Sequence, residues 1–239
     1  MPLPKIATPT YELELPSTRK PIHYRPFLVK EEKLLVLALE SEDIKEITTA
    51  IKNVIKSCVK TRGIKVENLP TFDIEYLFLN IRGKSVGEDI EVNLICPDDG
   101  KTQVPVTISI DDVKIQRSKE HTNKIKLDSS LMMEMKYPSL SEFIKNNFDF
   151  NEENVMNQSF EMIASCIDKI YNEEEVWAAA DCTKKEINDF LESMNTTQFK
   201  EIEKFFETMP KLSHKVKITN PNTKVESEVV MEGLSSFFG

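Results

Sequence analysis

Hydrophobic residues recur with helical spacing in some segments of this chain and alternate with polar residues in others. Helical spacing, with capping residues before it and Pro or Gly after it, predicts helices within 30–40, 43–58, 71–82, 139–148, 155–170, 183–194 and 195–209. Strict alternation predicts strands near 11–15, 22–26, 90–94, 104–110, 216–218 and 225–231. We therefore expect an α+β protein with a helical core, a small N-terminal hairpin and two further hairpins.

For two of these segments the sequence also predicts burial in the core. Residues 34–39 are apolar on every side of a helix, so the first helix is expected to be central and buried. Trp177 stands beside three alanines and is expected to pack in the core between helices. Gly83 is expected to break the helix that opens at Thr71.

A helix followed by a hairpin occurs twice in the chain. The turns of the two hairpins, Cys96-Pro97-Asp98 and Asn220-Pro221-Asn222, resemble each other, and the flanking strands have matching apolar positions. The pattern indicates two helix-plus-hairpin units and a possible internal pseudo-repeat. Identity between the halves is low, so duplication stays an open alternative.

The same pattern divides the chain into four parts. Residues 1–20 form an extended arm and the first strand, and residues 21–115 hold helices and the first hairpin. Residues 116–137 are a linker or an edge strand through Ile125 and Leu127, with methionines at 132–135 that fill a core or an interface. Residues 138–239 hold helices, the second hairpin and an apolar C-terminal tail.

Composition and charge exclude several classes of protein. The 239 residues include 40 acidic and 31 basic side chains, and the net charge of -9 argues against a nucleic-acid partner. We find no apolar run of membrane-spanning length and no signal-peptide pattern after Met1, so we expect no membrane partner and synthesis in the cytosol.

The hairpin turns invite comparison with a zinc ribbon, in which two turns each supply a pair of thiolates. The first turn has only Cys96, with Asp98 and Asp99 near it, and the second has Asn220 and Thr223. We expect no bound metal and turns held by hydrogen bonds. A degenerate ribbon that binds nucleic acid or metal is the alternative function. Of the other cysteines, Cys58 and Cys166 fall on apolar faces and are expected to be buried.

The sequence also lacks a recognisable catalytic motif. His23, His121 and His214 are scattered, and the six glycines form no phosphate-binding loop. We expect no catalytic residue, no cofactor and no enzymatic activity, with an unrecognised enzyme as the second alternative.

Four segments resemble a known protein family when they are taken together and in order. They are HYRPFLVKEEKLLVLALES (23–41), EYLFLNIRGKSVGE (75–88), the Cys96 hairpin, and FETMPKLSHKVKITNPNTK with VVMEGLSSFFG (206–239). These segments are similar to the baseplate hub proteins of T-even-type contractile-tailed phages, which include a hub subunit and a hub assembly catalyst. Members of that family often carry CxxC-type pairs in the hairpins, whereas this sequence retains Cys96 alone.

The resemblance implies a function by protein–protein binding. It implies participation in baseplate hub or wedge assembly, other hub subunits as partners, and a place in the host cytoplasm and possibly in the tail baseplate of the virion. Arg25, Pro26 and Phe27 offer an apolar anchor beside a guanidinium, a combination enriched at interfaces. They and the pair Phe237 and Phe238 are candidate partner contacts, with packing inside the chain as the alternative for Phe27 and for the Phe237–Phe238 pair.

Overall fold

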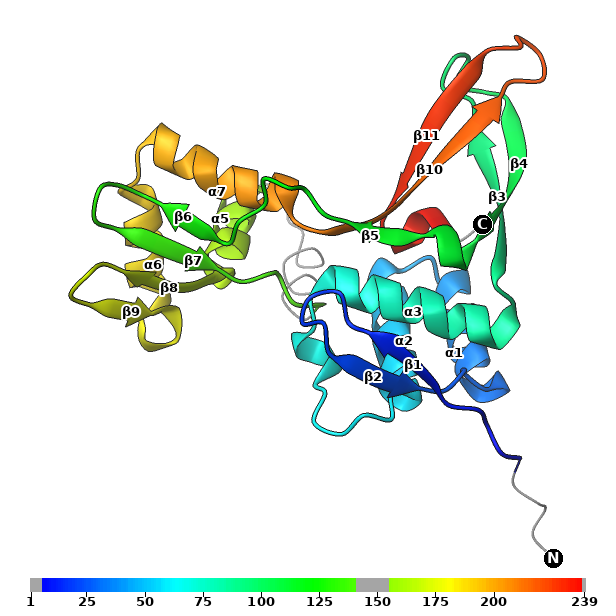
Figure 1. Ribbon diagram of the computed structural model, residues 1–239, viewed down its shortest axis with the longest axis horizontal. Helices are drawn as coiled ribbons and strands as arrows, with labels where there is room; N and C mark the ends of the chain where they lie inside the picture. Colours follow the sequence, from blue (N-terminus) through cyan, green and yellow to red (C-terminus); the bar gives the residue numbers. More distant parts are fainter. Residues whose placement is uncertain (1–5, 141–154, 238–239) are drawn as a thin grey trace, which may run out of the picture. The chain divides into compact units, whose positions relative to one another are not determined.

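The computed structural model describes residues 6–140 and 155–237 and confirms the α+β class. Within these residues the chain has six α-helices and eleven strands (Figure 1). Contacts divide the chain into two compact units. The first comprises residues 1–66, 72–116 and 211–239, and the second comprises residues 67–71 and 117–210.

The first unit contains three helices, a small N-terminal hairpin and two longer hairpins. Its elements are β1 (Tyr11–Glu14), β2 (Pro21–Tyr24), α1 (Val29–Glu40), α2 (Ile44–Cys58), α3 (Thr71–Val86), β3 (Asp89–Ile95), β4 (Gln103–Ser109), β5 (Lys114–Gln116), β10 (Lys211–Thr219) and β11 (Glu226–Glu232). Short 3-10 turns lie at Ile110–Asp112 and Leu234–Phe237, and a further one at Val66–Asn68 begins with the last residue of the segment 1–66. All three hairpins are antiparallel, and β5 adds to the free side of β10.

Helix α3 forms the centre of this unit. Its buried side chains include Ile74, Leu77, Leu79 and Ile81, which lie on more than one side of the helix. The prediction that Gly83 breaks the helix is wrong, because α3 continues to Val86. A Cβ at Gly83 would lie 2.8 Å from the side chain of Ile110, so glycine permits a close approach here.

Helix α1 is not the buried helix that its composition predicts. Its buried residues are Glu31 and Ala38, whereas large apolar side chains along the rest of the helix are exposed: Val29, Leu34, Val36, Leu37 and Leu39. The expectation failed because apolar composition states what a helix can bury and leaves open which neighbours cover it. In this chain the central position belongs to α3.

The second unit is a four-stranded antiparallel sheet packed with helices. Its elements are β6 (Lys124–Lys126), β7 (Met132–Met135), α5 (Val155–Ser165), β8 (Ile167–Tyr171), β9 (Val176–Ala178), a 3-10 turn (Ala179–Asp181), α6 (Lys184–Glu192) and α7 (Thr196–Thr208). The strand order is β6-β7-β8-β9. The predicted helix at 139–148 lies mostly outside the described residues.

One row of side chains crosses this sheet and carries its core. Ile125 pairs with Met133, Met133 with Ile170, and Ile170 with Trp177. Ile125 and Met133 are buried in a cluster with residues of the helices, among them Ile202 and Phe205. The methionines at 133 and 135 therefore fill a core, one of the two roles expected for them.

Two sequence predictions in this unit are wrong. The helix expected to run from 155 to 170 ends at Ser165, because residues 167–171 pair with β7 as strand β8. Trp177 lies on the edge strand β9 and is 40% exposed, so it is not enclosed between helices. Both errors come from pairing between distant segments, which periodicity does not contain.

The grouping of the chain also differs from the division drawn from sequence. The sequence pattern groups residues 138–239, whereas contacts group residues 211–239 with the first unit. The reason is the pairing of β10 with β5, in which Leu212 lies opposite Ile115, and the contact between the two hairpin turns described below. Residues 116–137 supply β6 at the edge of the second sheet and β7 inside it.

Candidate functional site

The turns of hairpins β3–β4 and β10–β11 share one backbone hydrogen bond and differ in another, since the N–H of Asn220 donates to the carbonyl of Val225, five residues on. The N–H of Cys96 donates to the carbonyl of Thr102, and the carbonyl of Cys96 accepts from the N–H of Gly100 at 2.9 Å. The carbonyl of Asn220 likewise accepts from the N–H of Lys224 at 2.9 Å. Gly100 and Lys224 both have positive φ, at 64° and 65°. The two turns thus have the same spacing for the inner hydrogen bond and positive φ at the same position, while the outer hydrogen bond of the second turn is one residue shorter.

The two turns lie against each other and form what we call the clasp: Cys96, Asp98, Asp99, Thr102, Asn220, Asn222 and Thr223 (Figure 1). Asn220, 1% exposed, is the centre of the clasp. Its Nδ2 donates to both carboxylate oxygens of Asp98 at 3.1 Å and to Oδ2 of Asp99 at 2.9 Å. Its Oδ1 accepts from the backbone N–H of Asn222 at 2.9 Å.

Two hydroxyl groups also donate to the aspartates of the clasp and stabilise their ionised form. Thr223 Oγ1 donates to Asp98, and Thr102 Oγ1 donates to Asp99. The Thr223 and Asn220 donors lower the pKa of Asp98, and the Thr102 hydroxyl and nearby backbone N–H groups lower the pKa of Asp99. Both carboxyls are therefore held ionised. Burial, with the charges of the two aspartates, raises the pKa of the Cys96 thiol and keeps it protonated.

This donor set does not fit a metal ion. Zinc needs deprotonated ligands, but Cys96 favours the thiol, and the amide N–H of Asn220 points at the carboxylates that would have to bind the ion. Among the residues that the structure describes, no three His, Cys, Asp or Glu side chains are arranged to hold a metal. The clasp is a hydrogen-bonded contact between two hairpins.

The candidate partner residues lie in the first unit, and the described ones are buried. Arg25 Nη2 lies 2.9 Å from Glu31 Oε1 in a buried ion pair, and Arg25 Nη1 donates to the carbonyl of Pro26. The N–H of Phe27 donates to Ser85 Oγ, and its ring is buried. Phe237 is 1% exposed, and Phe238 lies outside the described residues. The burial of Phe27 and Phe237 agrees with the packing alternative for these two residues.

A half-buried carboxyl group, that of Glu75, contacts the C-terminal segment. Glu75 on α3 accepts a hydrogen bond from the N–H of Leu234 at 3.3 Å, and burial raises the pKa of Glu75 to about 7. Sequence reasoning missed this group, because Glu75 lies among apolar residues without any local signal. Because Glu75 accepts this hydrogen bond from Leu234, the contact between α3 and the C-terminal segment depends on the protonation state of Glu75.

Sequence reasoning also missed the apolar surface on α1. We define the α1 surface as Leu28, Val29, Leu34, Val36, Leu37 and Leu39 of this segment, with exposed fractions from 38% to 67%. Val86, at the end of α3, is 53% exposed. The hydrogen bond from the N–H of Phe27 to Ser85 Oγ brings the end of α3, and with it Val86, near the start of α1. Exposed apolar patches of this kind mark sites of protein binding.

The second unit has a separate apolar edge on strand β9. Val176 is 64% exposed and lies beside Trp177, while β9 is the last strand of its sheet. The preceding turn carries three exposed acids, Glu173–Glu175, and its backbone is fixed by the side chain of Asn172. Trp is enriched at protein interfaces, and an edge strand offers unpaired backbone groups.

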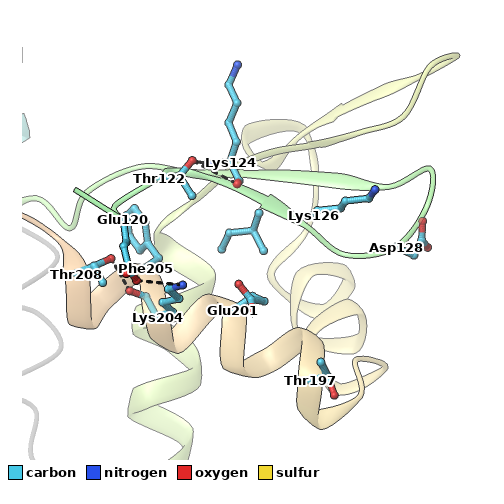
Figure 2. A pocket seen from close by; sticks show the side chains of 11 residues that line it. Glu120, Thr122, Lys124, Lys126, Asp128, Thr197, Glu201, Lys204, Phe205 and Thr208 are labelled. Atoms are coloured by element: carbon cyan, nitrogen blue, oxygen red, sulfur yellow. Dashed lines mark hydrogen bonds and ion pairs between the residues drawn. The ribbon is translucent and has the colours of Figure 1, made fainter. Parts of the chain in front are cut away.

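A cavity of about 500 Å³ lies between β6 and α7 (Figure 2). Ile125 and Phe205 are among its lining residues, and three lysines and three acids surround them: Lys124, Lys126, Lys204, Glu120, Asp128 and Glu201. Lys204 Nζ lies 3.5 Å from Glu120 Oε2. Because the opposite charges balance, the cavity selects neither an anion nor a cation.

His121 is close to this cavity and has a structural environment. Its Nδ1 lies 3.0 Å from Thr208 Oγ1, its Nε2 lies 2.9 Å from Tyr137 Oη, and its ring is stacked on the ring of Tyr137. Burial and the charge of Arg117 lower the pKa of His121. With both ring nitrogens engaged, His121 joins the linker segment to the aromatic core.

The described residues thus form an α+β protein with exposed apolar surfaces on α1 and β9. No helix in that part of the chain is long and apolar enough to cross a membrane. Over residues 8–239 the sequence matches the family of T4 bacteriophage base plate proteins, and the chain belongs to that family. Comparisons with curated proteins and with solved structures found no match.

Membership has direct consequences for role and location. The protein is a bacteriophage baseplate protein, and the family indicates interaction with other baseplate proteins and a place in the virion tail. Structural families of this kind are generally non-enzymatic.

Proposed function

We propose that this protein takes part in the assembly of the baseplate hub by binding other hub subunits, and that it has no enzymatic activity. The observation that carries the proposal is the family match over residues 8–239. The resemblance of four ordered segments to hub proteins favours the hub over other parts of the baseplate. Its place is the host cytoplasm during assembly, as a hub subunit or as an assembly factor.

The β9 edge is the surface that we assign to a hub partner. Trp177 provides an exposed aromatic side chain on this edge strand, and Glu173–Glu175 place negative charge in the turn before it. The partner would present an extended or apolar segment with basic residues next to it. This arrangement has the form of most protein interfaces, a central aromatic anchor with a charged rim.

The test is affinity purification of the tagged chain from infected cells. We expect hub subunits to co-purify with the natural sequence, and much less with a Trp177→Ala variant. Val225→Ala is the matched control, since Val225 is an exposed apolar residue in a turn of the first unit. If the tagged chain is purified without any baseplate protein, the proposed function is refuted. If Trp177→Ala leaves the amount of co-purified hub subunits unchanged, the assignment of the β9 edge to the partner is refuted.

Mass spectrometry of purified virions then separates the two roles. A hub subunit remains in the mature particle, whereas an assembly factor is found in infected cells and is absent from virions. The alternatives of a nucleic-acid or metal-binding ribbon and of an enzyme have no specific observation in their favour. Stoichiometric zinc or salt-sensitive DNA retention would bring back the first of them.

A further inference from the structure

The α1 surface has a pattern of charge and apolar residues that complements itself. Along one face of the helix, with spacings of four, three, one and three residues, lie Val29, Lys33, Val36, Leu37 and Glu40. All five are exposed, with Val36 at 48% and Leu37 at 63%. The apolar centre thus has a basic residue about one turn before it and an acidic residue about one turn after it.

The position of the basic residue before and the acidic residue after the apolar centre favours a second copy of α1 as the partner. If two copies of α1 pack in opposite directions about a twofold axis near Val36 and Leu37, the apolar residues meet their own counterparts. Lys33 of each copy then faces Glu40 of the other, which gives two equivalent ion pairs. A parallel arrangement would place Lys33 against Lys33 and Glu40 against Glu40, and like charges at such distances repel.

We infer that α1 is a self-association surface through which two copies of this chain form an antiparallel, twofold-symmetric dimer. This contact would cover Val36 and Leu37, two of the exposed apolar residues of 34–39. Helix packing at 8–10 Å between axes brings the long side chains of Lys33 and Glu40 within reach of each other. The interface is one helix wide, so we expect a reversible dimer.

The test is sedimentation equilibrium of the full chain over a range of concentrations. The natural sequence should show a monomer–dimer equilibrium, and Leu37→Glu should shift it to the monomer. Val225→Glu introduces the same charge at an exposed apolar residue outside both proposed binding surfaces and should leave the equilibrium unchanged. Circular dichroism spectra of all variants check that the fold is retained.

Charge reversal tests the antiparallel arrangement itself. Lys33→Glu and Glu40→Lys should each weaken the dimer roughly tenfold, because each turns two attractive contacts into repulsive ones. Combining the two reversals restores opposite charges and should restore the dissociation constant. A monomer at every concentration, a dimer indifferent to Leu37→Glu, or a double variant no tighter than the single ones would each overturn the inference.

Discussion

Asn220 is the residue through which the clasp can be tested most directly. Replacing it with aspartate, Asn220→Asp, keeps the size and shape of the side chain and exchanges its N–H₂ group for a carboxylate oxygen. The side chain is buried and its Nδ2 donates to Asp98 and Asp99. The substitution removes the donor and brings a third carboxylate to two that are already ionised.

The expected loss of stability follows from these contacts. The two N–H bonds of the amide serve charged acceptors, and a hydrogen bond to a charged group contributes about 1.5–3 kcal/mol. Water reaches Asp98, so we take the lower end for each bond and expect Asn220→Asp to reduce the free energy of unfolding by about 3 kcal/mol at pH 7. Repulsion should raise the pKa of the new carboxyl, so the difference from the natural protein should shrink as the pH falls and that carboxyl is protonated.

Equilibrium urea unfolding followed by circular dichroism measures this loss. Fluorescence of Trp177, the sole tryptophan, reports separately on the second unit. Asn222→Asp is the matched control, because Asn222 is exposed and its side chain donates only to Thr102 Oγ1 among the bonds that define the clasp. The pair Asp98→Asn with Asn220→Asp exchanges donor and acceptor and should recover part of the loss. If Asn220→Asp costs no more than Asn222→Asp, the clasp does not hold the hairpins together.

Three further predictions concern the tail, its carboxyl group and metals. The pKa of Glu75 is raised from 4.5 in the unfolded chain to about 7 in the folded protein, so its contribution to stability is fully present below pH 4.5. As the pH rises through 7, the free energy of unfolding should fall by about 3 kcal/mol. Urea unfolding at several pH values measures this dependence, and Glu75→Gln should flatten it. Phe237→Ala should lower the free energy of unfolding by about 3–5 kcal/mol, whereas Val225→Ala, at an exposed side chain, should change it little. Deletion of residues 233–239 should impair folding or partner binding. Chelators should leave the melting temperature unchanged, and a large fall in EDTA would show that the clasp holds a metal after all.

Much of the local structure could be predicted because its causes are local. Thr183 and Asn195 begin α6 and α7 with reciprocal side-chain caps, as their spacing to Glu186 and Gln198 indicates. Asp43 caps α2 with its side chain. The hairpins β3–β4 and β10–β11 follow the alternation of apolar residues and the turn residues between them.

The candidate site was predictable only in part. The sequence indicated that Asn220 and Thr223 hold a turn by hydrogen bonds, and Asn220 does accept from the backbone of its own turn. It did not indicate that the same side chain reaches Asp98, 122 residues away. The α1 surface and Glu75 were missed for a related reason, since exposure and burial depend on which elements cover a residue.

The sequence by itself determined the α+β class, most helix starts, the hairpins and the family. These depend on periodicity, caps and turn residues within about a dozen positions of one another. Only the tertiary structure decided that α3 is central and α1 exposed, that 167–171 is a strand, and that residues 211–239 belong with the first unit. The physical reason is that burial and strand pairing are properties of contacts between distant segments, and the same apolar residue can face a core or a partner.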